Sequence, residues 1–395
     1  ETVEFVPNYD GTTTEPKVLP AVIPQLLLNG TFGIAVGMAS NIPSHNLNEI
    51  LDATMLLIDN PNASMEELLK IVKGPDFPTG GLIYNKKDIH AAYSSGRGGI
   101  VCRGEAEILE DDKGKSQIII SSIPYNVNKA ELILKVADMV NEKKIEGIKD
   151  IRDESNKEGM RVAIDLKPDS FPQKILNALY KHTDLEKMFH FNMVALVDGI
   201  QPQTLSLKSI IDYFIKHRQI VVERRTRFDL RKAEERAHIL EGLKKALDHI
   251  DEIIKTIKAS PDKEIAHERL VKKFSFSDRQ AEAILEMRLQ TLAGLERQKI
   301  EDELKEKQQL IKDLRALLKD PKKILEVIKS ELSAIKEKYG DERRTKIIAR
   351  EVGEISYEDT IPDTPAILAL TAGGYVKRLD PQIYKTQKRG GKGII

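Results

Sequence analysis

Cations and glycines are concentrated close to the end of the chain, where their types and spacing suit contact with phosphate groups. Three cations and three glycines fall among seven consecutive positions there: Gln387, Lys388, Arg389, Gly390, Gly391, Lys392 and Gly393. Glycine lets a backbone approach a phosphate closely, and each cation neutralises part of its charge. On composition alone, a solvated basic tail explains the run more simply. The sequence context of the run therefore has to decide between the two interpretations.

A second strip of this kind lies in the first third of the chain. Arg97 and Arg103 enclose a glycine-rich run with few acids, and Lys86 and Lys87 precede it. Arginine can hold phosphate oxygens in a bidentate fork, so the composition predicts an edge that contacts a nucleic-acid backbone. A surface hairpin with incidental arginines explains the same composition almost as well.

A glycine-rich segment, residues 26–38, is apolar rather than basic. Gly30, Gly33 and Gly37 stand there among small apolar residues. Such glycines indicate tight turns and close backbone approach, and a buried loop in an α/β core is the simplest interpretation. The functional alternative is a rigid apolar wedge, in which Ile34 inserts between base steps and kinks a duplex.

Composition limits the classes of protein that remain. The 395 residues are 41% apolar and 31% charged with a formal net charge of zero, which indicates two or three globular domains whose polyanion binding must come from local patches. The single cysteine, Cys102, excludes an internal disulfide framework and fits a reducing compartment. The sequence shows no signal peptide and no apolar run near the ~20 residues of a membrane span, so we expect a cytoplasmic protein without membrane contact. The spacing of the histidines and of Cys102 predicts no metal site.

The elements that must position these residues begin with an α/β region. From residue 20 to about 216, short β-rich runs alternate with amphipathic helical stretches. Residues 118–120 and 162–164 are typical of strands, and residues 130–140 are typical of a helix. Residues 105–120 predict one hairpin that turns at 110–114.

A long helical hairpin is predicted after this region. Apolar residues recur at spacings of three and four between Leu230 and Ile257, which predicts a helix over about 220–258, roughly 58 Å long at 1.5 Å per residue. Ser277 and Gln280 form a capping-box pattern that opens a short helix at the far end. A return helix reaches Pro321 and resumes over 324–339. Taken alone, this hairpin is better explained as an ordinary interdomain coiled coil.

The far end of the hairpin forms a small helical knob with more apolar residues than two helices can cover. Exposed apolar patches of this kind usually mark an interface, so we expect the knob to bind a second copy of the chain. The residues predicted to form this contact are Ile284, Leu285, Met287, Leu289, Leu292 and Leu295.

Two short strands are predicted before the basic run. Residues 366–370 and 375–379 are apolar or β-prone, and Gly373 and Gly374 supply the turn between them. From residues 366 to 393, the sequence resembles the start of the C-terminal domain of the DNA gyrase A subunit. The run 387–393 resembles the GyrA box of that domain, with Lys388 where Arg is also common.

Almost the whole chain resembles the A subunits of bacterial type IIA DNA topoisomerases, and DNA gyrase in particular. The matching stretches are distributed from end to end: 5–11 (FVPNYDG), 33–38 (GIAVGM), 123–125 (IPY), 150–155 (DIRDES), 224–228 (RRTRF) and 287–290 (MRLQ). These matches are long, ordered and numerous, so the resemblance decides between the interpretations left open above.

The resemblance implies a multidomain α+β protein. Residues 1–16 would be a linker after a winged-helix domain, and 17–216 an α/β tower domain that flanks the cleaved DNA. Residues 217–350 would form a long antiparallel coiled-coil arm with an exit-gate knob at about 262–297. Residues 351–395 would begin a C-terminal β-pinwheel domain that wraps DNA. Because the chain starts at Glu1 without Met in a linker-like run, we expect it to be a fragment.

The resemblance also implies the roles of particular residues. Ile34 matches the residue that wedges into the bent gate DNA, and Asn29, Lys86, Lys87, Arg97 and Arg103 would contact the DNA backbone. The nucleophile of the family is a Tyr in an Arg-Tyr-Thr-Glu motif, and none of the ten tyrosines here follows an Arg. We therefore expect no catalytic residue in this chain, which would be inactive alone.

The complete enzyme implied by the resemblance is an ATP-dependent A2B2 topoisomerase that introduces negative supercoils by double-strand passage. Its partners would be double-stranded DNA, the B subunit of gyrase, which carries Mg²⁺ and ATP, and a second copy of the A subunit. No cofactor is expected on this chain. The A subunit of topoisomerase IV is the nearest alternative, and it lacks a regular GyrA box. A structural coiled-coil DNA-binding protein is the alternative from another class, but it would not predict the tower motifs.

Overall fold

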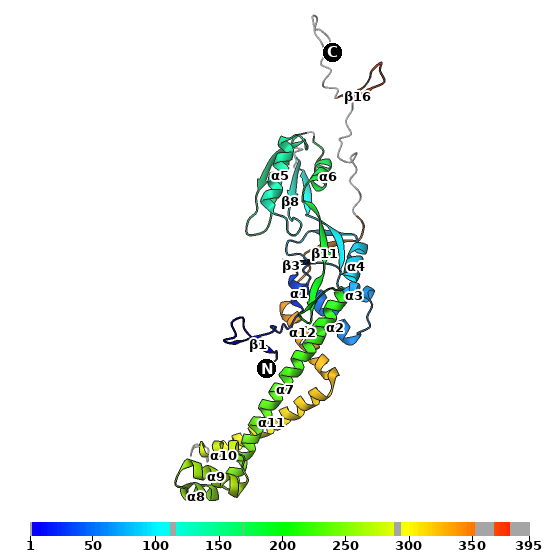
Figure 1. Ribbon diagram of the computed structural model, residues 1–395. Helices are drawn as coiled ribbons and strands as arrows, with labels where there is room; N and C mark the ends of the chain where they lie inside the picture. Colours follow the sequence, from blue (N-terminus) through cyan, green and yellow to red (C-terminus); the bar gives the residue numbers. More distant parts are fainter. Residues whose placement is uncertain (1, 111–115, 169, 288–293, 352–366, 380–395) are drawn as a thin grey trace. The chain divides into compact units, whose positions relative to one another are not determined.

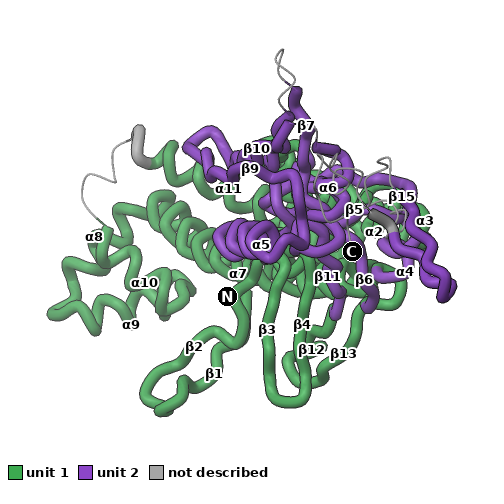
Figure 2. Tube along the Cα trace, turned by 90° about the horizontal axis from the view of Figure 1, so that it is seen from above, with its two compact units in different colours: residues 1–73, 93–96, 193–342 green, residues 74–92, 97–192, 343–395 purple. Residues whose placement is uncertain are grey.

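The computed structural model describes residues 2–110, 116–168, 170–287, 294–351 and 367–379, and it is a mixed α/β protein (Figure 1). The described residues divide into two compact units, and each unit is built from segments that are separate in the sequence (Figure 2). Unit 1 contains residues 1–73, 93–96 and 193–342, and unit 2 contains residues 74–92, 97–192 and 343–395.

Unit 1 contains the long helices and three two-stranded hairpins. Its helices are α1 (Gln25–Asn29), α2 (Leu47–Asp59), α3 (Met65–Ile71), α7 (Leu207–Asp248), α8 (Ile250–Lys258), α9 (Lys263–Phe274), α10 (Asp278–Leu285), α11 (Gly294–Lys319) and α12 (Pro321–Tyr339). Its strands pair in sequence order as β1 (Phe5–Pro7) with β2 (Thr14–Pro16), β3 (Thr31–Ala35) with β4 (Met38–Ile42), and β12 (Val194–Val197) with β13 (Gln201–Thr204).

The predicted helical hairpin is confirmed, with different ends. Helix α7 packs along α11 through a seam that includes Leu240 and Leu304, and α12 continues the return path after Pro321 (Figure 1). The first helix begins at Leu207 rather than near 220, because Ser206 caps it there and its first turns are buried in the body of unit 1. It also breaks at His249, whose φ of −118° and ψ of 29° are not helical.

The knob at the far end has its own core. Its helices α8, α9 and α10 enclose Ile253, Leu270, Phe276 and Ile284. The predicted capping box is confirmed, because the Ser277 side chain accepts from the Gln280 backbone N–H while the Gln280 side chain accepts from the backbone N–H of Ser277. At the opposite end of the arm, α2, α7 and α12 share a second core that contains Leu51, Val222 and Ile328.

Unit 2 contains two groups of paired strands and a few short helices. Four antiparallel strands pair in the order β7 (Ala106–Glu110), β8 (Ser116–Ile120), β10 (Val162–Leu166) and β9 (Ile148–Asp153). Helices α5 (Lys129–Asn141) and α6 (Pro172–His182) pack against their apolar side through residues such as Ile118, Val136 and Leu179. The predicted hairpin over 105–120 and the predicted helix over 130–140 are therefore confirmed, and the turn at 111–115 lies outside the described residues.

The second group of strands in unit 2 carries the Arg97–Arg103 strip. Strands β14 (Lys346–Ile348), β5 (Leu82–Tyr84), β6 (Arg97–Arg103) and β11 (Glu186–Asn192) pair in that order. Helix α4 (Lys86–Ser95) lies between β5 and β6 in the sequence. The two strands predicted near the C-terminus are confirmed as the antiparallel hairpin of β15 (Ile367–Leu370) and β16 (Val376–Leu379).

Candidate nucleic-acid interface

The β3–β4 hairpin presents apolar side chains to solvent instead of burying them. Phe32 is 69% exposed, Ile34 is 80% exposed and Val36 at the turn is 102% exposed. Side chains alternate along a strand, so Phe32 and Ile34 lie on the same face of the hairpin. The interpretation of this segment as a buried loop is therefore wrong, and the wedge interpretation has the exposed side chain that it requires.

The base of the hairpin is closely packed. Gly30 has a φ of 66°, and a Cβ at this position would lie 2.6 Å from the carbonyl oxygen of Ile42. Only glycine fits both the backbone conformation and this contact. Farther along, the Ser40 hydroxyl donates a hydrogen bond of 2.6 Å to the Val194 carbonyl of β12. The exposed apolar tip therefore extends from a support that is fastened on both sides.

Asn29 is the last residue of α1 and is exposed, directly before Gly30. Its position in the sequence and in unit 1 puts it next to the base of the hairpin. It is the predicted contact residue that lies just before the strand that carries Ile34.

The paired lysines lie on unit 2 at the start of α4. Lys86 and Lys87 are both exposed, and the backbone N–H of Lys87 donates to the Asn85 side chain, which begins the helix. A helix N-terminus carries partial positive charge, so two cations there raise the local positive potential further. This end of α4 can attract an anion such as a phosphate group.

The two arginines of the strip differ in their surroundings. Arg97, at the start of β6, is exposed. Arg103, at the end of β6, is 13% exposed, pairs with Glu186, and lies with its guanidinium carbon 5.1 Å and 4.6 Å from the ring centroids of Tyr84 and Tyr180. Packing between two aromatic rings and a carboxylate gives Arg103 a structural role inside unit 2. The prediction that Arg103 contacts DNA is therefore corrected.

The glycines of the strip are also explained by packing inside the protein. A Cβ at Gly96 would lie 2.4 Å from the Leu205 carbonyl oxygen, and one at Gly98 would lie 2.9 Å from the Cβ of Ala92. The sequence favours these glycines as positions for close approach to phosphate. Their neighbours in the fold are instead backbone and side chains of the chain itself.

The residues predicted for the dimer contact are divided by the structure. Ile284 is 3% exposed and packs into the knob's own core, where Leu285 also contacts it, so the prediction of Ile284 as a dimer contact is corrected. Met287 packs against the seam of α7 and α11. Leu289, Leu292 and the side chain of Leu295 lie outside the described residues.

The basic run 387–393 also lies outside the described residues. The hairpin that precedes it is described, and it leaves Leu368, Leu370, Tyr375 and Val376 exposed.

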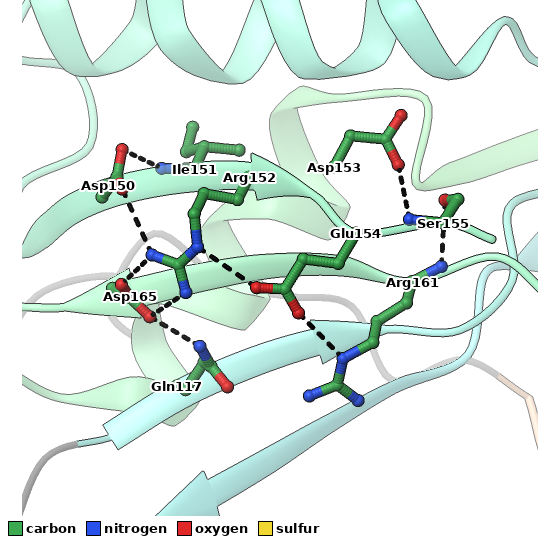
Figure 3. Close-up of polar contacts among 9 residues, drawn as sticks. All are labelled: Gln117, Asp150, Ile151, Arg152, Asp153, Glu154, Ser155, Arg161 and Asp165. Carbon is green, nitrogen blue, oxygen red and sulfur yellow. Dashed lines mark hydrogen bonds and ion pairs between the residues drawn. The ribbon is translucent and has the colours of Figure 1, made fainter.

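An ion-pair network that the sequence motifs did not predict covers one face of the four-stranded sheet in unit 2 (Figure 3). Arg152 pairs with Asp150, Glu154 and Asp165, and Arg161 pairs with Glu154. Hydrogen bonds from Arg161 and Arg152 lower the pKa of Glu154, and the hydrogen bond from Arg152 lowers that of Asp165. In the sequence, the alternating charges of residues 150, 152 and 154 are the feature that could have indicated this network. Because these cations are already paired, this face is a weaker site for phosphate than the exposed lysines of α4.

Reactive groups of other kinds give no catalytic arrangement in the described part of the chain. Burial raises the pKa of the Cys102 thiol to about 12, which leaves it protonated and unreactive at neutral pH. Among the described residues, no group of three or more His, Cys, Asp or Glu side chains could hold a metal ion. The described helices include none that is both long and apolar enough to cross a membrane.

Comparison with known proteins finds one matching family model and several similar curated proteins. A family model described as the A subunit of DNA gyrase/topoisomerase IV matches residues 1–333. The chain is 52% identical over 393 residues to the DNA gyrase A subunit of Clostridium acetobutylicum, a match that covers 100% of this chain and 47% of the relative. It is 50% identical over 394 residues to that of Lawsonia intracellularis, covering 100% of this chain and 48% of the relative. The corresponding protein of Staphylococcus epidermidis is 48% identical over 395 residues, covering 100% of this chain and 44% of the relative. The chain thus spans about half the length of the curated relatives that it matches.

Proposed function

Because the chain belongs to the family of DNA gyrase and topoisomerase IV A subunits, we propose that it forms the part of a gyrase A subunit that binds and bends the gate DNA. Residues 17–216 would serve as the tower, the α7–α11 hairpin and its knob as the arm of the exit gate, and 351–395 as the start of the β-pinwheel wrapping domain. In the complete A2B2 enzyme these parts would support ATP-dependent negative supercoiling.

The observation that carries the proposal is the exposed apolar tip of the β3–β4 hairpin. Ile34, 80% exposed, is held on a paired strand that is fixed at its base by Gly30 and, farther along, by the hydrogen bond from Ser40 to Val194. Opening a base step costs a few kcal/mol of stacking, which the longer contact along bent DNA offsets. A stiff support is needed because a flexible loop would yield before the stacked bases separate.

The backbone contacts proposed are Asn29 on unit 1 and Lys86, Lys87 and Arg97 on unit 2, which are all exposed. They would hold the duplex by its phosphates and fix its position, whereas the wedge would bend it. Arg103 is left out of this set because its charge is engaged with Glu186.

Strand cleavage is assigned to a residue outside this sequence. A Tyr hydroxyl would attack a DNA phosphate and form a phosphotyrosine bond, and the 3′ hydroxyl of the broken strand would leave and later reverse the step. No Tyr of this chain follows an Arg as the family nucleophile does. We therefore propose that this chain alone is inactive.

The partners proposed are double-stranded DNA, a second copy of the A subunit through the exit gate, and the gyrase B subunit, which would supply ATP and Mg²⁺. The compartment proposed is the cytoplasm. The A subunit of topoisomerase IV stays the nearest alternative, and the run 387–393 favours gyrase because it resembles a GyrA box. A purely structural coiled-coil protein is disfavoured by membership of an enzyme family.

Replacing Ile34 with Ala in the intact A subunit, assembled with the B subunit, tests the wedge. The change removes about 2 kcal/mol of apolar contact, so the bent population of a gate-length duplex should fall by at least about tenfold. Energy transfer between dyes at the two DNA ends measures the bend angle, and Ile34→Leu should retain most of it.

The matched control is Leu196→Ala, which truncates another exposed apolar side chain, 56% exposed on β12 of the same unit. It should leave the bend angle unchanged. An Ile34→Ala enzyme that bends DNA as the parent does would refute the proposed function.

A further inference from the structure

His45 joins the base of the wedge hairpin to helix α4 through both of its ring nitrogens. Its Nδ1 lies 2.7 Å from the carbonyl oxygen of Leu27, and its Nε2 lies 2.7 Å from the hydroxyl of Tyr93. His45 is 5% exposed and Tyr93 is 0% exposed. Both residues belong to unit 1, so the contact lies inside one compact body.

The chemistry of the Leu27 partner fixes a hydrogen on Nδ1. A carbonyl oxygen can only accept, so Nδ1 must carry the hydrogen that is donated to Leu27. In the neutral ring, Nε2 is then an acceptor, and the Tyr93 hydroxyl donates to it. The chain of donors therefore runs from Tyr93 through His45 to Leu27.

His45 and its partner Leu27 lie on opposite sides of the hairpin in the sequence. Leu27 lies in α1, just before β3, and His45 follows the end of β4. The His45 backbone N–H also donates to the Leu28 carbonyl at 3.4 Å, and the Ile42 carbonyl oxygen fills the space that a side chain at Gly30 would need. The imidazole thus closes the base of the hairpin, and Tyr93 connects that base to the end of α4.

A small movement at this base is amplified at the tip. Strands rise about 3.4 Å per residue, so Ile34 lies roughly 14 Å along the strand from Gly30. A rotation of about 10° at the base would displace Ile34 by about 2 Å, which is more than half of the rise between stacked bases. The angle of the base therefore decides whether the side chain meets a base step.

We propose that His45 is a positioning residue for DNA bending, which orients the Ile34 wedge by tying the hairpin base to Tyr93. The inference rests on the proposed function of Ile34. The inference goes beyond that function because it assigns the angle of the wedge to a buried hydrogen-bonded pair, His45 and Tyr93.

Three substitutions in the intact A2B2 enzyme separate the two bonds. Tyr93→Phe removes only the hydroxyl. His45→Gln places an amide near Nε2 and loses the bond to Leu27, whereas His45→Asn places one near Nδ1 and keeps it. A lost neutral hydrogen bond shifts an equilibrium by up to about tenfold. We expect Tyr93→Phe and His45→Asn, which both lose the bond to Tyr93, to broaden the distribution of bend angles and to lower the bent population by up to about that factor, with His45→Gln, which keeps that bond, closer to the parent.

The matched control is Thr54→Val, which removes another buried hydrogen bond of unit 1, from the Thr54 hydroxyl to the Ile50 carbonyl in α2. Like the His45 variants it should lower the melting temperature, but it should leave the bend angles of the folded enzyme unchanged. Measuring DNA binding well below each melting temperature separates positioning from general stability.

The outcomes distinguish this inference from the proposed function. If Ile34→Ala reduces bending while Tyr93→Phe and both His45 variants match the parent, His45 has no positioning role. If Ile34→Ala also leaves bending unchanged, the proposed function fails first and this inference fails with it. Should the His45 variants not fold, Tyr93→Phe decides alone, because it leaves the ring packing intact.

Discussion

Residues of the same type have different roles in this chain because their surroundings differ. Lys86 and Lys87 are exposed at the N-terminus of α4, where the helix adds to their positive potential. Arg103 instead directs its charge to Glu186 and its guanidinium face to two tyrosine rings. The burial of each cation therefore separates the proposed DNA contacts from structural charges.

Neutralising each class of cation should affect DNA binding differently. Lys86→Gln and Lys87→Gln should weaken binding similarly for all DNA sequences and each reduce the slope of log affinity against log salt by about 0.9. Arg103→Gln should leave that slope unchanged and instead lower the melting temperature of the protein. Salt titrations of duplex binding, combined with thermal melts, provide the measurement. An equal loss of slope for Arg103→Gln would restore it to the DNA-contacting set.

At the scale of elements, the arm is fixed to the body of unit 1 by a buried ion pair between two helices. Arg218 of α7 is 3% exposed and its guanidinium lies 2.6 Å from the Glu331 carboxylate of α12, which also accepts from Arg225 at 2.6 Å. Burial alone would raise the pKa of Glu331, but the hydrogen bonds from Arg218 and Arg225 outweigh it and the pKa is lowered.

Removing the carboxylate should therefore destabilise the junction. Glu331→Gln leaves Arg218 as a buried charge without its counterion, which should cost about 3 to 5 kcal/mol in the free energy of unfolding at neutral pH. The folded pKa lies below the unfolded one, so this stability is present above about pH 4.3 and is lost as the pH falls below it. Parent and variant should converge in acid.

Denaturant unfolding at a series of pH values checks this prediction. The matched control is Asp59→Asn, which breaks the exposed pair that Lys329 of the same helix forms with α2. An exposed pair contributes about 1 kcal/mol or less, so its loss should be small. Equal losses for the two variants would show that burial of Arg218 adds nothing.

At the scale of the whole molecule, the chain passes repeatedly between its two compact units, so neither unit is one continuous segment. The surfaces proposed for DNA are correspondingly spread along the sequence, from Asn29 to the run 387–393. Under the proposal, the β3–β4 hairpin of unit 1 bends the DNA, and the run 387–393 helps to wrap it.

Replacing residues 387–393 with alanine in the intact A subunit should separate these two tasks. Wrapping needs the cations and glycines of the run, whereas cleavage and strand passage do not. Negative supercoiling should therefore be lost while ATP-dependent relaxation is retained, as gel assays of plasmid topology would measure. Supercoiling at the parental rate would identify the run as a solvated basic tail.

The sequence by itself determined several of the elements and the family. Apolar spacing of three and four predicted the helical hairpin, a Ser277 and Gln280 pair predicted the start of α10, and alternating runs predicted β7, β8 and β10. These features depend on neighbours within a few positions, so the sequence displays them directly. The order and number of its motifs indicated the family before any fold was known.

Only the tertiary structure decided which side chains are exposed and able to contact a partner. Residues far apart in the sequence determine burial. Arg103 pairs with Glu186 and packs on the Tyr180 ring. The Leu205 carbonyl leaves no room for a side chain at Gly96, and the knob core buries Ile284. The same is true of the exposed Ile34 and of the contact between His45 and Tyr93, which are 48 positions apart. A side chain's exposure and hydrogen bonds depend on what the fold brings to it, and no local pattern contains that information.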